Sequence, residues 1–422
     1  MKTITLNHIT KIEGHAKLNL SIDEGKVSVC ELSAVEGSRY FEGLVIGRKY
    51  FEAHEITSRI CGICSCAHVI AAITAIENAL GFHASQQTKQ LRELLMIGER
   101  IRSHATHLYF LALPDYLGYE SALAMAGKYK KEIQRALAMM RMGNLIVKTI
   151  GGRDLHPISA TVGGWLKLPD KEQLNMLAKE LFALTADALA TVKLFAGLKN
   201  PVFHSETEWF SISHAKEYAL LEGMFISQKT KFEPVRYKEF IREYHEPRST
   251  SNFIVKKDHR YMVGALARLN NNHQHLSANA KRALQLAKLK MPSDNPYHNN
   301  LAQAIEIVHC IDHAIRICKA GVQPEPVANI PLRAGTGIAA IEVPRGTLWH
   351  EYTVDEKGTI IKANIITPTA QNLLNMQEDI RSFLPSIINR SKEYIVLAVE
   401  KLIRSYDPCF SCSAHFLEVN WR

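Results

Sequence analysis

Two Cys-x-x-Cys pairs stand far apart in this 422-residue chain, one at Cys61 and Cys64 and the other at Cys409 and Cys412. Each pair places two sulfur atoms within one turn of backbone, and four thiolates brought together form a site for a soft metal ion. The fold must then close a loop of nearly the whole chain, at an entropic cost that grows only with the logarithm of loop length. On spacing alone, structural zinc and an iron–sulfur cluster are the favoured occupants.

The surroundings of the pairs differ from those of a zinc ribbon, which usually holds its two pairs close together in a small, loop-rich module. The first pair leads into the apolar segment 69–80, which ends at Gly81 and is typical of a buried helix with a glycine C-cap. A disulfide framework is disfavoured in a chain of this length with only eight cysteines.

Longer motifs enclose both pairs. The first pair lies in Arg-x-Cys-Gly-x-Cys-x-x-x-His at residues 59–68, and the second in Asp-Pro-Cys-x-x-Cys-x-x-His at residues 407–415. Three further motifs are Lys-Ile-Glu-Gly-His at 11–15, Arg-Tyr-Phe-Glu-Gly at 39–43 and Glu-Val-Pro-Arg-Gly at 342–346. In this order, the five motifs resemble those of the large, catalytic subunit of nickel–iron hydrogenases.

The resemblance extends from about residue 3 to residue 415 and is nearest to the cytosolic, cofactor-linked members, of the sulfhydrogenase or bidirectional type. It implies a hydrogenase, an oxidoreductase that reversibly cleaves H₂ heterolytically to protons and electrons at a nickel–iron centre. The chain has no further cysteine set for an electron relay, so the expected partner is an iron–sulfur small subunit. Diaphorase or other electron-transfer subunits, a maturation chaperone and a C-terminal protease are further expected partners.

The resemblance also implies a set of metal ligands. Cys61, Cys64, Cys409 and Cys412 are expected to bind nickel, with Cys64 and Cys412 bridging to an iron that carries carbon monoxide and cyanide. A second ion, magnesium or iron, is expected at a separate site formed by a carboxylate and an imidazole, which suit an octahedral ion with waters. Its expected ligands are Glu42 and His415.

Three residues are expected to be catalytic: Cys409, Arg345 and Glu13. An arginine is a difficult base, because keeping it neutral at pH 7 costs about 9 kcal/mol. We therefore expect the Cys409 thiolate to accept the proton and Glu13 to pass it onward. Arg345 and the adjacent Pro344 are expected to contact the cofactor, with Arg345 stabilising the polar transition state and anchoring the cyanide ligands.

Other positions near the motifs carry narrower expectations. His68 shares a helix face with Cys64 and is expected to hydrogen-bond toward a bridging sulfur. Ser103 stands where many uptake enzymes have an aspartate, which leaves the carboxylate support of Arg345 open. The last residues, 416–422, correspond to a tail that a protease removes in much of the family.

Composition excludes some classes of function. The net charge of +9 fits either simple solubility or a basic face for an acidic partner, and the sequence lacks the dense Lys/Arg blocks typical of nucleic-acid binding. No apolar run is long enough for a membrane span, and the N-terminus does not resemble a signal peptide. The resemblance to the cytosolic members implies a cytoplasmic protein. The alternative function is that of a structural zinc or iron–sulfur protein without hydrogenase activity.

The elements that must position these residues follow from hydrophobic periodicity. Residues 3–36 and about 334–366 alternate as small antiparallel sheets, and residues 64–80 form a helix. Long helical patterns occupy residues 86–113, 121–150, 170–198, 257–290, 297–320 and 369–404. Cys64 is expected at the start of one helix. Asp407 and Pro408 are expected to cap and begin another at the second pair.

The predicted fold is mainly α, a large helical bundle with minor β structure, in a single domain over residues 1–422. Its parts are a β-rich segment at about 3–36, a helical core at about 64–320, a β insert at about 334–366, a C-terminal helix with the metal motif at 369–415, and a cleavable tail at 416–422.

Overall fold

The computed structural model describes residues 2–7, 9–23, 26–37 and 40–414. The apolar segment after the first cysteine pair forms helix α3 (Ser65–Leu80), and nearly all of its side chains are buried. The helix ends at Gly81, whose φ of +66° is the left-handed conformation of a glycine C-cap and whose N–H bonds to the Asn78 carbonyl. The expected helix at 64–80 therefore matches the structure.

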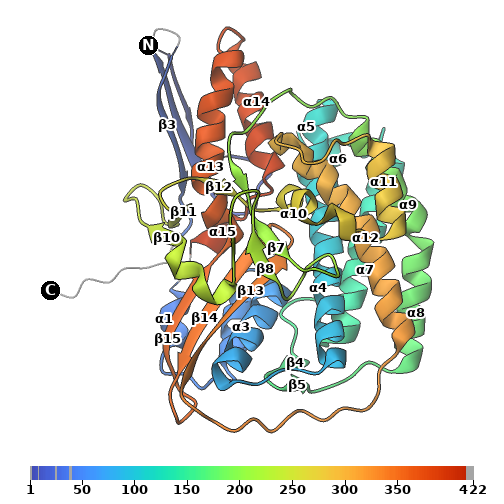
Figure 1. Ribbon diagram of the computed structural model, residues 1–422. Coiled ribbons are helices and arrows are strands. Elements are labelled where there is room, and N and C mark those ends of the chain that lie inside the picture. The colour runs from blue at the N-terminus through green and yellow to red at the C-terminus, as the bar shows by residue number, and fades with distance from the viewer. Residues whose placement is uncertain (1, 8, 24–25, 38–39, 415–422) are drawn as a thin grey trace, which may run out of the picture.

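Helices make up most of the regular structure in the described chain, and α4, α7, α8, α9, α11 and α12 gather on the right side of Figure 1. The longer helices besides α3 are α4 (Gln86–Thr106), α7 (Lys130–Gly151), α8 (Lys171–Ala183), α9 (Thr185–Ala196), α10 (Ala265–Asn272), α11 (Ala278–Ala287), α12 (Asn299–Ala320), α13 (Pro368–Phe383) and α14 (Lys392–Ser405). The short helices are α1 (Phe41–Val45), α2 (Ala53–Thr57), α5 (Leu113–Leu117), α6 (Ala122–Met125) and α15 (Phe410–Ser413). Helix α4 packs along α7, and α12 packs against α4, α8, α9, α10 and α11.

Two three-stranded antiparallel sheets stand where the sequence predicts β structure. The first consists of β1 (Lys2–Leu6), β2 (Ala16–Asp23) and β3 (Lys26–Ala34). The second consists of β13 (Gly335–Val343), β14 (Gly346–Val354) and β15 (Ile360–Ile366). Strands β13 and β14 pack on α3, while β3 packs on α13. Mainly helical structure with small antiparallel sheets confirms the predicted fold class.

The segment between residues 200 and 262, which the sequence patterns do not assign to a helix over most of its length, holds further short strands within the predicted helical core at about 64–320. They are β6 (Glu208–Trp209), β7 (Ser211–Ser213), β8 (Met224–Ile226), β9 (Lys231–Phe232), β10 (Ile241–Tyr244), β11 (Phe253–Lys256) and β12 (Tyr261–Met262). A two-stranded pair, β4 (Ala160–Thr161) and β5 (Gly164–Trp165), also interrupts that range. Aromatic side chains, including Phe210, Phe225 and Trp349, form a second apolar cluster around these strands.

Several predicted long helices are broken in the structure. The pattern at 257–290 begins with strand β12 and then forms two helices, the second capped by Ser277, whose hydroxyl accepts the Ala280 N–H. The pattern at 369–404 breaks after α13, because Pro385 lacks the N–H that a continuing helix needs. The pattern at 86–113, by contrast, is helical throughout, as α4 to Thr106 and then as a π-helical turn, His107–Ala112, that leads into α5. The spacing of apolar residues along the sequence does not reveal where one helix ends and the next element begins.

The first and last parts of the chain meet at the cysteine motifs. Glu13 forms a parallel backbone bridge with Cys409, and the carbonyl of Glu13 accepts the N–H of Phe410. In Figure 1 the N-terminal strands stand beside the C-terminal helices α13 and α14. The fold therefore closes the long loop that the two cysteine pairs demand.

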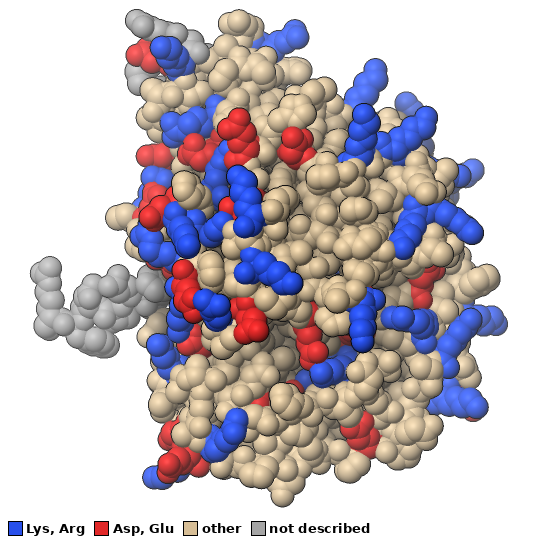
Figure 2. Space-filling view, in the orientation of Figure 1, with Lys and Arg blue, Asp and Glu red and all other residues tan. Residues whose placement is uncertain are grey.

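Surface charge is dispersed on the face drawn in Figure 2. Lys and Arg side chains are scattered over this face, with Asp and Glu among them, and do not form one continuous block. None of the helices within the described residues combines the length and the apolar character that crossing a membrane requires.

Candidate metal centre

The first cysteine pair is held at the start of α3. Cys64 is the N-cap residue of this helix, and its N–H lies 3.3 Å from the sulfur of Cys61. The carboxylate of Glu99, on α4, accepts the N–H of Cys66 at 2.7 Å and so satisfies a helix N-terminal donor. Burial, reinforced by the nearby Cys64 sulfur, raises the pKa of Glu99 to about 8. The sequence expectation that Cys64 opens the helix agrees with this geometry.

The second pair is presented differently from the expectation. Cys409, not Asp407, is the N-cap residue of α15, and Asp407 has a φ of +52°, so it cannot act as the predicted cap. The side chain and carbonyl of Asp407 instead contact other residues of the site. The hydroxyl of Thr369 accepts the Cys409 N–H at 2.8 Å and fixes the loop against α13.

All four cysteines meet in one buried cluster. The sulfurs of Cys61, Cys64 and Cys412 all lie within 4.8 Å of one another, and the Cys409 sulfur is 3.8 Å from that of Cys61. Hydrogen bonding, first of all from Cys409, lowers the pKa of Cys61, whereas burial raises the pKa of Cys409 and of Cys412. A bound cation would favour the thiolate form of all four.

This donor set fits a soft transition metal. The four cysteines are buried, and within the described residues the one close group of three or more metal-ligating side chains consists of cysteines. Hard ions such as magnesium prefer oxygen ligands, while nickel, iron and zinc accept thiolates. The arrangement therefore suits a nickel–iron centre, but four thiolates by themselves do not separate it from zinc.

Arg345 reaches the cluster from the turn between β13 and β14. Its Nη1 lies 3.2 Å from the Cys64 sulfur, and its Nε donates to the carbonyl of Asp407 at 2.8 Å. The Asp407 carboxylate forms an ion pair with the same Nε at 3.2 Å. Burial alone would lower the pKa of Arg345, but Asp407 and the cysteine sulfurs raise it well above its usual range.

The Asp407 contact answers the question that Ser103 left open, because the second cysteine motif itself supplies the carboxylate beside Arg345. Ser103 is buried on α4, and within the described part of the chain its hydroxyl has no hydrogen-bond partner.

A small cavity adjoins the sulfurs and the arginine. Its walls combine apolar side chains with polar groups. The lining residues are Cys64, His68, Val343, Arg345, Leu348, Thr367, Pro368, Thr369, Cys409 and Cys412. Pro344 is not among them, and its carbonyl instead accepts from Arg268 Nη2 at 2.9 Å. Such a cavity is suited to a very small apolar substrate.

Glu13 contacts the cluster directly. The Cys409 thiol lies 2.7 Å from Glu13 Oε2 in a geometry in which the sulfur donates. The hydroxyl of Ser411 donates to the other carboxylate oxygen at 2.6 Å, and also lies 3.4 Å from Oε1 of Glu36. Glu13 and Glu36 are both partly exposed, so this series of groups leads from the buried sulfurs toward solvent.

Of the remaining expected site residues, the structure describes His68 and Glu42 but not His415. His68 lies on α3 at the cavity, and its Nδ1 is 3.1 Å from Nε2 of His350, whose Nδ1 is in turn 2.7 Å from the Tyr352 hydroxyl. Glu42, on α1, accepts the Ile365 N–H at 2.7 Å. His415 lies outside the described residues, so the pairing with Glu42 stays a prediction.

The other cysteines are buried apart from this cluster, as expected for small apolar side chains. Cys310 and Cys318 both lie on α12, and burial raises the pKa of each to about 12. Cys66 lies on α3, and burial raises the pKa of its thiol well above the usual range.

Sequence reasoning missed several supporting residues. Thr369, Ser411 and Glu99 form hydrogen bonds at or near the two cysteine pairs. None of the three was predicted to be a metal ligand. Asp407 and Ser411 both stand within the second motif, but the sequence assigned Asp407 to helix capping and gave Ser411 no role.

Known proteins resemble this chain in sequence. The sequence pattern of the nickel-dependent hydrogenase family matches residues 39–145 and 258–415. The alpha subunit of sulfhydrogenase 1 from Pyrococcus furiosus is 36% identical, over 99% of this chain and 98% of that one. The alpha subunit of sulfhydrogenase 2 from the same organism is 33% identical, over 99% of this chain and 100% of that one.

Solved structures share the fold. An NAD⁺-reducing [NiFe]-hydrogenase in its H₂-reduced state superposes with a TM-score of 0.88, at 24% identity, over 98% of this chain and 100% of that one. The chain belongs to the nickel-dependent hydrogenase family. This confirms the expected oxidoreductase function, a hydrogenase catalytic subunit with a nickel–iron centre, over the alternative of a protein without hydrogenase activity.

Proposed function

We propose that this chain is the catalytic subunit of a cytoplasmic nickel–iron hydrogenase in which Cys409, Glu13 and Arg345 carry the proton chemistry. The observation that supports this most directly is the 2.7 Å contact between the Cys409 thiol and the Glu13 carboxylate at the edge of a buried sulfur cluster. Residues from the two ends of the chain meet there, a contact that the two cysteine motifs alone would not require.

A nickel–iron centre held by Cys61, Cys64, Cys409 and Cys412, with carbon monoxide and cyanide on the iron, would supply the cleavage of H₂ to two protons and two electrons. Arg345 and His68 would contact this centre from the walls of the cavity. Pro344, next to Arg345 in the chain, would be a third contact to the centre. Glu42 and His415 would hold a second ion, magnesium or iron.

Cys409 would take up the proton released on cleavage. The thiolate form would accept it, and the sulfur lies 2.7 Å from Glu13 Oε2, so the resulting thiol would pass the proton on across one hydrogen bond. From Glu13, the Ser411 hydroxyl offers the next position, and the partly exposed Glu36 carboxylate lies beyond it. This order gives the proton a path of short steps to the surface.

Arg345 would remain a cation throughout. Its carboxylate partner Asp407 and the neighbouring sulfurs favour the charged form, and a guanidinium is a poor proton acceptor even without them. A fixed positive charge at the cavity stabilises negative charge that develops on the reacting groups, which is an electrostatic rather than a basic role.

Electrons would leave through an iron–sulfur partner subunit. Within the described residues, the single close group of three or more metal-ligating side chains belongs to the cysteine cluster itself. Exposed apolar side chains, including Leu44, Ile46 and Phe51, lie on α1 and in the segment between α1 and α2, and they suit a partner surface. Helix α2, which follows this segment, packs against α3. The relatives named as alpha subunits also belong to enzymes of several subunits, and a diaphorase subunit is a further candidate.

Maturation would involve a chaperone and a protease that removes residues 416–422 after metal insertion. The last motif ends at His415, and these residues extend beyond it. Mass spectrometry of the active complex should then give a chain that ends at His415. An active, nickel-containing complex that retains Arg422 would contradict this step.

We also propose a single domain, since one buried apolar cluster extends from Ile4 to Cys412.

Metal content of cysteine variants tests the ligand set. Cys61→Ala, Cys64→Ala, Cys409→Ala and Cys412→Ala should each lose nickel and all H₂ oxidation, because removal of a thiolate breaks the coordination. Cys310→Ala and Cys318→Ala remove buried thiols outside the proposed ligand set. These two variants should keep their nickel content and their H₂ oxidation activity. A ligand variant with full nickel content and normal turnover would refute the assignment.

A further inference from the structure

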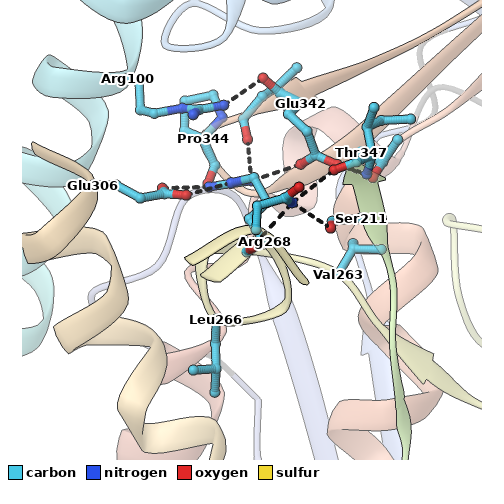
Figure 3. A network of polar contacts seen from close by, with 12 residues as sticks. Arg100, Ser211, Val263, Leu266, Arg268, Glu306, Glu342, Pro344 and Thr347 are labelled. Atoms are coloured by element: carbon cyan, nitrogen blue, oxygen red, sulfur yellow. Dashed lines mark hydrogen bonds and ion pairs between the residues drawn. The ribbon is translucent and has the colours of Figure 1, made fainter. Parts of the chain in front are cut away.

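The turn that carries Arg345 is held from behind by a second arginine. Arg268, on α10, donates from Nη1 to the carbonyl of Val343 at 2.8 Å and from Nη2 to the carbonyl of Pro344 at 2.9 Å. These are the two peptide carbonyls directly before Arg345. Figure 3 shows Arg268 between this turn and the acidic side chains that hold it. None of the five sequence motifs includes Arg268.

The position of Arg268 is itself fixed by two buried carboxylates. Its Nε and Nη2 donate to Glu306, on α12, at 2.7 and 2.8 Å, and its Nη1 pairs with Glu342 at 3.0 Å. Arg268, Glu306 and Glu342 are completely buried. Glu306 also accepts from Tyr218, at 2.7 Å, so the guanidinium has little freedom to move (Figure 3 shows the charged pair).

Charge in this cluster is balanced. Burial alone would raise the pKa of Glu306, but the attraction of Arg268 lowers it well below the usual range. His104 lies 2.8 Å from Glu306, and burial lowers the pKa of this histidine to about 4, so it stays neutral near pH 7. Arg100 donates to the carbonyl of Glu342 at 2.7 Å. The cluster therefore contains two arginines, Arg268 and Arg100, and the carboxylates of two glutamates.

We infer that Arg268 is a positioning residue for Arg345, acting through the two carbonyls of the turn. Arg345 is fixed at its side chain by Asp407 and reaches Cys64 with Nη1 at 3.2 Å. The opposite anchor, at its backbone, is Arg268. A shift of the turn would move the guanidinium relative to the sulfurs, and errors of about 1 Å in such groups cost about 100-fold in rate. This inference rests on the role proposed above for Arg345.

The other reading is that Arg268 only stabilises the fold. Elsewhere in the chain, Arg92 offers a matched comparison, because it is also buried and bonds twice to one carboxylate, Glu77, at 2.6 and 2.7 Å. Neither Arg92 nor Glu77 belongs to the cysteine cluster or holds the Arg345 turn. Arg92→Lys therefore measures what replacing a buried, paired arginine costs by itself.

The test uses the purified holoenzyme complex with Arg268→Lys, which keeps the charge but cannot donate to two carbonyls and a carboxylate from one planar group. We expect nickel and iron contents equal to those of the unmodified complex, and kcat for H₂ oxidation lower by about 10- to 100-fold. The infrared bands of the diatomic ligands should shift, as they should in Arg345→Lys. In Arg92→Lys, kcat should stay within about twofold and the bands should not move.

A double-mutant cycle separates positioning from general stability. If Arg268 acts through Arg345, adding Arg268→Lys to Arg345→Lys should lower kcat by less than about threefold further. If the two substitutions instead lower kcat independently, so that their single fold-reductions multiply in the double variant, the inference is overturned. It is also overturned if Arg268→Lys has normal kcat and unshifted infrared bands. If Arg268→Lys does not fold, Glu342→Gln replaces it, since it removes one ion pair at constant size and should give the same coupling. An unmodified complex without nickel would instead contradict the proposed function.

Discussion

Two side chains from opposite ends of the sequence, Glu13 and Cys409, meet at 2.7 Å at the edge of the sulfur cluster. Proton transfer across this contact requires a carboxylate that can both accept and release a proton. The contact could not be predicted from spacing, because 396 positions separate the residues. The motif around Glu13 nevertheless identified the residue, since the resemblance supplied a role that local sequence patterns do not.

Replacing Glu13 with glutamine tests this contact. Glu13→Gln keeps the size of the side chain and removes its titration, so both metals should stay bound while turnover falls by about 100-fold or more. The assays are H₂ oxidation and evolution together with elemental analysis. Glu172→Gln, at an exposed position on α8, is the control and should behave like the unmodified enzyme. Normal turnover in Glu13→Gln would show that protons leave by another path.

Helix starts and tight loop contacts fix the two cysteine pairs. The apolar run and Gly81 allowed α3 to be predicted, because both signals are local. The breaks at Ser277 and Pro385 were missed, since periodicity continues across them. Arg268 and Glu306 could not be predicted as a buried pair, because charged residues on helices usually face solvent and only tertiary contacts reveal the exception.

Gly14 allows the Glu13 loop to approach the second cysteine loop. Its φ is +81°, and a Cβ atom there would lie 2.5 Å from the backbone nitrogen of Ser411. Gly14→Ala should therefore displace Glu13 from Cys409 and lower turnover by about tenfold or more. Gly127→Ala is the control, since no atom lies within 4 Å of its added Cβ. Equal kcat values in the two variants would mean that the close approach is not needed.

Three buried histidines on different helices make stability depend on pH. Burial lowers the pKa of His54 and of His104 to about 4, and that of His309 to about 3. The unfolded chain binds these protons near pH 6.5, so unfolding takes up protons between that pH and the lower folded values. Each histidine therefore contributes stability that is complete above pH 6.5 and is lost as the pH falls toward 4.

The slope of stability against pH measures this proton uptake. Each buried histidine should contribute up to about 1.4 kcal/mol per pH unit within the window. His54→Gln should flatten the fall in thermal midpoint between pH 6.5 and 4.5, whereas His204→Gln, whose side chain is 72% exposed, should not. An unchanged slope in His54→Gln would mean that this histidine is protonated in the folded chain.

The molecule as a whole brings the two ends of the chain to one buried centre and leaves an apolar surface near the first cysteine pair. Leu155 and Ile158 are also exposed, and the ring Nδ1 of His156, which stands between them in the sequence, lies 2.9 Å from the Ser58 carbonyl. Composition provides only the net charge and could not show which apolar side chains the fold leaves exposed.

Association with an iron–sulfur partner tests this surface. Phe51→Asp should weaken co-purification of the two subunits by about tenfold or more, because it puts a charge into an apolar contact. Val235→Asp changes an apolar residue that is at least as exposed, 63% against 52%, in a different region, and should leave association intact. Full assembly with Phe51→Asp would place the partner elsewhere.

Metal analysis of the complex that contains this chain and its iron–sulfur partner tests the central claim most directly. The four buried sulfurs and the family membership predict nickel and iron at the cysteine cluster, with infrared bands from bound carbon monoxide and cyanide. Cys409→Ala should abolish those bands together with the nickel. Zinc alone in an otherwise intact complex, with no such bands and no H₂ oxidation, would contradict the assignment of a nickel–iron hydrogenase centre.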